Sequence, residues 1–159
     1  MRLIVQKSSL KGSISIPPSK SHTIRAFILG LLAKGTSEII NPLNSRDTEA
    51  CIKACQLLGA TIKKQDNSWF IQGIGNHLCN PQKTIDIMNS GTTLRLLTCV
   101  ASLAPFKTIF DGDWQIRTRP MQPLLEALNN LGANCKSLQN NGRCPISVQG
   151  PLTGGKTTI

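Results

Sequence analysis

The sequence contains no tyrosine, and aromatic residues of all kinds make up only 4% of its 159 residues. Surfaces that stack the bases of single-stranded nucleic acids are built from aromatic side chains, so no such surface is expected. Acidic residues are also scarce, because eight Asp and Glu oppose 18 Lys and Arg and leave a net charge of +10. This surplus favours an anionic partner, such as a nucleic acid, an acidic membrane or a phosphorylated small molecule.

Long apolar runs are absent as well. No stretch approaches the roughly 18 residues of a membrane span. The N-terminus runs almost directly into the strand-like residues 3–6 and shows no signal-peptide pattern. With 40% hydrophobic and 16% charged residues, the composition is that of an ordinary folded domain. We therefore expect a cytoplasmic protein without a membrane partner.

The six cysteines show none of the paired spacings that hold a metal. There is no C-x-x-C, and only His77 lies near a cysteine, Cys79. Usual zinc sites combine four Cys and His ligands at short, regular spacings, so no metal site is expected. Without a secretion signal, we expect the cysteines to be reduced and mostly buried.

The chain repeats itself about seventy residues further on, and a repeat of this kind organises the whole fold. Arg25 in SHTIRAFILGLLAKG corresponds to Arg95 in GTTLRLLTCVASLAP, and WFIQG corresponds to ISVQG. The apolar spacing of each copy predicts the order β-α-β-α-β-β, an α/β fold of the layered α+β kind. The expected strands are 13–16, 36–41, 60–65, 68–73, 84–87, 107–111, 133–138 and 144–149, and the expected helices are 21–34, 46–58, 91–104 and about 120–131.

The repeats divide the chain into four parts. Residues 13–80 and 81–151 are expected to be two complete units, and 152–159 the start of a third, with its opening strand at 157–159. Residues 1–12 are expected to form a strand segment that belongs to another domain. These divisions predict two units of a longer protein whose third unit is cut off.

Cations and small residues stand at the start of the same helix in both copies. Free backbone N–H groups and the helix dipole attract anions to such positions. A cation in a first turn opposes the dipole, and broken local rules of this kind tend to mark functional sites. For either arginine alone, a solvated surface position is an equal alternative. The residues are Lys20, Ser21 (as N-cap) and Arg25 in the first copy, and Asn89, Gly91, Thr92 and Arg95 in the second.

A further cationic segment, 113–121, precedes the second helix of the second copy. Arg119 stands directly before Pro120, which disfavours a helical conformation at Arg119 and points to a loop. A guanidinium on a rigid turn suits bidentate binding of phosphate or carboxylate. Arg117 is better explained as an ordinary surface residue.

Residues 150–157 match the phosphate-binding loop G-x-x-x-x-G-K-[ST]. That loop requires a helix directly after it, whereas the repeat predicts a strand there. The segment also contains Pro151, and no acidic residue is placed to hold magnesium. We interpret it as a turn.

The segments PPSKSHTIRAFILGLLAKG, NSGTTLRLL and GDWQIRTRPMQPLLEAL resemble, in this order and spacing, the N-terminal part of the 5-enolpyruvylshikimate-3-phosphate (EPSP) synthase family. The resemblance covers essentially the whole chain and somewhat more than the first third of a family member. It implies two domains, each of three β-α-β-α-β-β units, that close on the substrates. It also implies a monomer without a cofactor that transfers the enolpyruvyl group of phosphoenolpyruvate to shikimate 3-phosphate and is the target of the herbicide glyphosate.

The resemblance also implies roles for the residues at the two helix starts. It implies that Lys20 contacts both substrates and takes part in catalysis, and that Ser21 and Arg25 hold shikimate 3-phosphate. Phosphoenolpyruvate would be bound by Gly91 and Arg119, in a pocket lined by Asn89, Thr92 and Arg95. None of the eight acidic residues matches a catalytic carboxylate of the family, so we expect this chain alone to be inactive.

Two alternatives remain. A sister family with the same fold acts on UDP-N-acetylglucosamine and typically has a cysteine in the loop corresponding to 112–119 and Lys-Asn at the first helix. Here that loop has no cysteine and Lys20 precedes Ser21, which favours the shikimate family. A nucleic-acid-binding module would also suit the charge, but the lysines are scattered and form no run.

Overall fold

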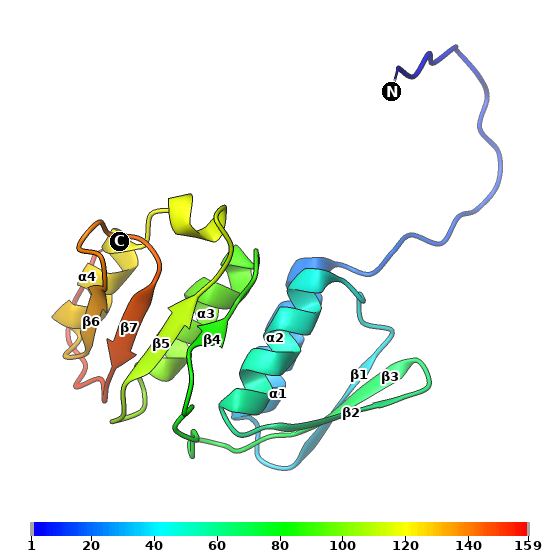
Figure 1. The fold of residues 1–159 in the computed structure, drawn as a ribbon. Coiled ribbons are helices and arrows are strands. Elements are labelled where there is room, and N and C mark those ends of the chain that lie inside the picture. Colours follow the sequence, from blue (N-terminus) through cyan, green and yellow to red (C-terminus); the bar gives the residue numbers. More distant parts are fainter. Residues whose placement is uncertain (1, 159) are drawn as a thin grey trace.

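The computed structural model describes residues 2–158, and each repeat folds as a small sheet packed on helices (Figure 1). The elements of the first repeat are α1 (Lys20–Leu32), β1 (Thr36–Ile40), α2 (Arg46–Leu57), β2 (Thr61–Gln65) and β3 (Ser68–Gln72). Those of the second repeat are β4 (Ile85–Asp86), α3 (Gly91–Ala101), β5 (Thr108–Asp111), the 3-10 helix η1 (Ile116–Thr118), α4 (Gln122–Asn130), β6 (Asn134–Ser137) and β7 (Ile146–Gln149). The α/β fold is therefore confirmed, and most elements lie within a few residues of their expected positions.

The two sheets differ by one strand. In the first repeat the order is β1-β3-β2, and both pairings are antiparallel. In the second repeat the order is β4-β5-β7-β6, with β4 parallel to β5 and Ile85 opposite Phe110. The last two strands of each predicted unit pair antiparallel with each other, as β2–β3 and β6–β7.

The missing strand corrects one expectation. Residues 13–16 form no strand, and Ile14 and Ile16 are 87% and 78% exposed in an arm that extends away from α1 (Figure 1). The equivalent Ile85 and Ile87 of the second repeat are fully buried, because their segment pairs with β5. A strand is stabilised by its pairing partner, and within residues 2–158 no partner lies beside 13–16.

Neither end of the described chain forms a strand. Residues 2–12 were expected as a strand segment and are extended and exposed. Residues 157–158 were expected to open a third unit and lie in no strand, and residue 159 lies outside the described residues. Residues 150–155 are irregular, and within residues 2–158 no helix follows them, which agrees with the rejection of the phosphate-binding loop.

One apolar core joins the two repeats. α1 buries Ile24, Phe27 and Leu31 at helical spacing, and α3 does the same with Leu94 and Leu97. Both α1 and α2 contact α3. The N-terminal halves of α1 and α3, which carry most of the candidate site residues, are therefore positioned by a shared core.

Glycines at the ends of β3 and β7 fix each sheet to its helix. Gly73 donates its N–H to the Gly35 carbonyl at 2.9 Å, and Gly150 donates to the Ala104 carbonyl at 2.8 Å. A β-carbon on Gly73 would collide with the carbonyl oxygens of Gly30 and Ala33, and one on Gly150 would collide with that of Ser102. The repeated Gln-Gly of the sequence thus marks the place where a strand end crosses a helix C-terminus without room for a side chain.

Four of the six cysteines (Cys51, Cys55, Cys135 and Cys144) are buried and two are exposed, and all six are free thiols. None of the helices in residues 2–158 has the length and apolar character that crossing a membrane requires.

A candidate anion-binding site between two helix starts

A pocket of about 370 Å³ lies between the second turn of α1 and the N-terminal part of α3. It brings together three arginines from three elements: Arg25 of α1, Arg95 of α3 and Arg119, which follows η1. The remaining lining residues are Gly91, Thr92 and Leu96. Five of the residues singled out in the sequence therefore share one pocket, although they come from both repeats.

The three arginines are held to different degrees. Arg95 donates to the carbonyl oxygens of Gly91 at 3.4 Å and Pro120 at 3.2 Å, so its guanidinium joins α3 to the segment after η1. Arg119 donates to the side-chain oxygen of Asn89 at 3.5 Å. Arg25 is exposed and has no hydrogen-bond partner among the described residues. Arg25 and Arg119 are thus the cations most available to a bound anion.

Gly91 lets the cations close on the start of α3. It is the first residue of the helix, and a β-carbon there would lie 2.6 Å from Nη1 of Arg119 and 3.3 Å from Nη1 of Arg95. Among residues 2–158, no side chain caps this end: the Ser90 hydroxyl instead lies 2.6 Å from that of Thr93. An uncapped helix start beside two guanidinium groups has the chemistry of a phosphate or carboxylate site.

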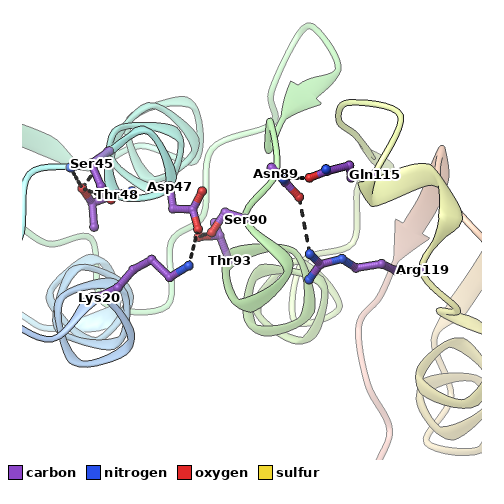
Figure 2. A network of polar contacts seen from close by, with 9 residues as sticks. All are labelled: Lys20, Ser45, Asp47, Thr48, Asn89, Ser90, Thr93, Gln115 and Arg119. Atoms are coloured by element: carbon purple, nitrogen blue, oxygen red, sulfur yellow. Dashed lines mark hydrogen bonds and ion pairs between the residues drawn. The ribbon is translucent and has the colours of Figure 1, made fainter. Parts of the chain in front are cut away.

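Lys20 lies on the other side of the α3 start from Arg119 (Figure 2). It is the first residue of α1, and its ammonium group forms an ion pair of 2.7 Å with Asp47 in the first turn of α2. Asp47 and Asn89 both line a neighbouring pocket of about 490 Å³, together with Arg46, Asp86, Met88, Gly112 and Asp113. Lys20 therefore stands beside this second pocket and not among the three arginines.

Sequence reasoning missed Asp47. Its position was readable in part, since Ser45 and Thr48 form a capping box that starts α2 and places Asp47 in the first turn. Its contact with Lys20 joins residues 27 positions apart and depends on how α1 and α2 pack.

Ser21 does not cap α1. The helix begins one residue earlier than expected, and the side chain of Ser19 accepts the His22 N–H at 3.4 Å. The Pro17-Pro18 pair keeps the chain extended up to residue 18, so Ser19 is the first residue able to cap. Ser21 is half-buried and lies outside the lining of the arginine pocket.

The loop that carries Arg119 is held by several polar contacts. Asn89 donates to the side chain of Gln115 (Figure 2), and the Asp113 carboxylate accepts the Ile116 N–H at 3.0 Å. Arg117 is exposed, as expected, but it is not a free surface residue. It binds the carboxylate of Asp111 through two nitrogens, at 2.9 and 2.5 Å.

This ion pair sets the acid–base behaviour of Asp111. Partial burial acts to raise the pKa of Asp111, but the hydrogen bonds from Arg117 and the Gly112 N–H, with the Arg117 charge, hold it below its usual value. A folded-state pKa below the unfolded one stabilises the fold above about pH 4, and this contribution is lost as the pH falls through the folded pKa.

We therefore expect Asp111→Asn to be less stable than the wild type at neutral pH, with a difference that shrinks as the pH falls below about 4. Urea unfolding of both proteins across this range measures the difference. A gap in unfolding free energy that stays constant with pH would show that the ionised carboxylate contributes nothing.

Comparisons with known proteins agree with the resemblance seen in the sequence. The family model described as EPSP synthase (3-phosphoshikimate 1-carboxyvinyltransferase) matches residues 4–159. Relatives named 3-phosphoshikimate 1-carboxyvinyltransferase from Acetivibrio thermocellus and Methanothermobacter thermautotrophicus are each 48% identical to the chain and match 100% of it. An EPSP synthase structure from Acinetobacter baumannii matches 93% of the chain with a TM-score of 0.85 and 27% identity, over 34% of its own length. The chain spans 38% of the length of the two curated relatives.

Proposed function

The chain belongs to the EPSP synthase family, and on that premise we propose that the protein containing it transfers the enolpyruvyl group of phosphoenolpyruvate to the 5-hydroxyl of shikimate 3-phosphate and releases phosphate. The observation that carries the proposal is the pocket in which Arg25, Arg95 and Arg119 surround the uncapped start of α3. Both substrates carry a phosphate and a carboxylate, which such a pocket is suited to bind.

The α3 side of the pocket is proposed to bind phosphoenolpyruvate. The backbone at Gly91 is open to a close approach, and Arg119 supplies a planar pair of donors beside it. Arg95 is already bound to two carbonyl groups, so its role is to position the Arg119–Pro120 segment and to add positive charge. Asn89 orients Arg119, and Thr92 completes the pocket wall.

The α1 side is proposed to bind shikimate 3-phosphate. Arg25 is exposed and reaches the pocket from the second turn of α1, and Ser21 lies one turn before it. Because Arg25 has no bond within the described residues to give up, it can meet a phosphate without losing a protein contact.

Lys20 and Asp47 are proposed to act as a pair. Asp47 holds the ammonium group of Lys20 beside the second pocket, on the other side of the α3 start from Arg119. A fixed cation there stabilises negative charge that develops as the carbon–oxygen bonds form and break. The carboxylates that move protons in the reaction are proposed to lie in the part of the protein outside this chain.

We propose that a second domain closes over the bound substrates. Leu3, Ile4, Val5 and Leu10 are 76–95% exposed in the N-terminal arm, a pattern that fits a segment made to pair elsewhere. We propose that residues 1–12 belong to that second domain, that 13–80 and 81–151 are two units of the first, and that 152–159 begin its third unit. The six free cysteines fit a cytoplasmic enzyme, and we propose that it is monomeric and needs no cofactor.

The two alternatives are not favoured. Transfer to UDP-N-acetylglucosamine lacks support, because the loop 112–119 has no cysteine and the curated relatives carry the shikimate name. A nucleic-acid-binding module finds no support among these relatives either.

A thermal-stability titration of the 159-residue chain tests the proposal. Shikimate 3-phosphate is expected to raise the unfolding temperature, since a ligand at a hundred times its Kd adds about 2.7 kcal/mol. Arg25→Ala is expected to weaken this response about tenfold or more, because a hydrogen-bonded cation is lost. Arg143→Ala removes an exposed arginine away from the pocket and is the matched control.

Two parallel ligands decide between function classes. ATP with magnesium tests the loop at 150–157, and a short RNA at low and high salt tests the nucleic-acid module. Stabilisation by either one in place of shikimate 3-phosphate would overturn the proposed function. A chain that responds to none of the ligands would show that it does not form the proposed half-site.

A further inference from the structure

The ion pair between Asp111 and Arg117 spans the loop that leads to η1. Asp111 ends β5, and Arg117 lies in the middle of η1. Two nitrogens of one guanidinium meet two oxygens of one carboxylate, at 2.9 and 2.5 Å. Isolated ion pairs on the surface contribute little to stability. A bidentate contact with a carboxylate that is only 20% exposed, however, fixes the orientation of the guanidinium group as well as its distance.

The same loop is fixed at its base by neutral contacts. The Asp113 N–H donates to the Met88 carbonyl at 2.8 Å, and the fully buried Ile116 anchors η1 in the core. These contacts fix where η1 starts. The ion pair acts further along, at Arg117, and fixes how η1 is turned.

The orientation of η1 decides where Arg119 points. Arg119 follows η1 directly, and its N–H donates to the Ile116 carbonyl at 3.0 Å. Its side chain is exposed and makes one long contact of 3.5 Å, with Asn89. The place from which this side chain reaches toward α3 is therefore set by its Cα, which directly follows η1, while Asn89 orients the guanidinium group.

We propose that Asp111 and Arg117 are positioning residues: their ion pair holds η1 in the orientation that places the Arg119 guanidinium beside the start of α3. This inference rests on the proposed function, because Arg119 is proposed there to bind phosphoenolpyruvate. The pair itself touches no substrate and acts through Arg119 alone.

The test uses Arg117→Gln, Asp111→Asn and the charge-reversed double variant Asp111→Arg/Arg117→Asp, with Arg143→Gln as the matched control. Amide hydrogen exchange of residues 112–119 without ligand reports on η1 directly. Affinity for phosphoenolpyruvate and for shikimate 3-phosphate is measured on the same proteins. Each single variant is expected to speed exchange in this segment severalfold and to weaken phosphoenolpyruvate binding about fivefold to tenfold.

Two results separate positioning from a general loss of structure. The affinity of the single variants for shikimate 3-phosphate should stay at the wild-type value, because Arg25 is carried by α1. The double variant should return both the exchange rate at 112–119 and the affinity for phosphoenolpyruvate toward the wild-type values. Unchanged exchange at 112–119, or an equal loss of affinity for both ligands, would overturn the inference. If the wild-type chain bound neither phosphoenolpyruvate nor shikimate 3-phosphate, the proposed half-site would be overturned. The amide exchange rates at 112–119 would then still decide whether the Asp111–Arg117 ion pair holds η1.

Discussion

Gly91→Ala is expected to weaken phosphoenolpyruvate binding about tenfold to a hundredfold and to leave the fold intact. The added β-carbon would lie 2.6 Å from Nη1 of Arg119, closer than two such atoms approach. The Arg119 guanidinium group is the far end of a flexible side chain, so it moves away at little cost to stability. It then no longer faces the start of α3, and losing a hydrogen bond to a charged group costs about 1.5–3 kcal/mol of binding free energy.

The stability of this variant is a separate part of the prediction. Gly91 is the first residue of α3 and does not belong to the positive-φ residues, so alanine fits its backbone. Alanine also reduces the freedom of the unfolded chain, and the unfolding free energy should stay the same or rise by up to about 1 kcal/mol. Isothermal titration and urea unfolding measure the two quantities on one preparation.

A double-mutant cycle with Arg119→Ala provides the control. If Gly91→Ala acts by displacing Arg119, it should cost little further affinity once Arg119 is absent. Two single losses that simply add in the double variant would contradict this mechanism. They would mean that the β-carbon excludes the ligand by itself.

The largest expected loss of stability comes from Gly73→Ala and Gly150→Ala, each about 3 kcal/mol. At both positions the new β-carbon would collide with carbonyl oxygens at the C-terminus of the helix beneath the strand end. A backbone carbonyl cannot rotate away as a side chain does, so the strand end or the helix end must shift. Urea unfolding of each variant measures the loss.

Gly75→Ala separates this collision from backbone strain. Gly75 has φ +61°, and a β-carbon there would meet only the Lys34 side chain, at 3.5 Å. Its expected loss is about 1 kcal/mol, from the left-handed backbone alone. If Gly73→Ala were no worse than Gly75→Ala, the close approach of strand and helix would not be what requires glycine.

The repeat made most of the fold predictable. Helices and hairpins depend on patterns within about fifteen residues, and two copies of the same pattern support each other. The start of α1 was misplaced by one residue because two serines, Ser19 and Ser21, compete for the cap in the sequence. The strand at 13–16 was wrong because a strand also depends on a partner, which no local pattern records.

The cationic residues of the candidate site could be predicted from the sequence, but the acidic residues that pair with cations could not. Arg25, Gly91, Arg95 and Arg119 could be singled out from the helix starts and the proline, and the structure brings them into one pocket. Asp47 and Asp111 could not be assigned their roles, because their contacts with Lys20 and Arg117 depend on packing between elements. Charge pairs of this kind follow from the tertiary structure.

The pocket is divided between the two repeats, with Arg25 on α1 and Gly91 and Arg95 on α3. It exists only while both repeats are folded at the same time. An anion bound there therefore favours the states in which neither repeat has opened, and it acts as a reversible cross-link between two units that could otherwise unfold locally. Anion binding at this pocket would therefore be coupled to the cooperativity of folding.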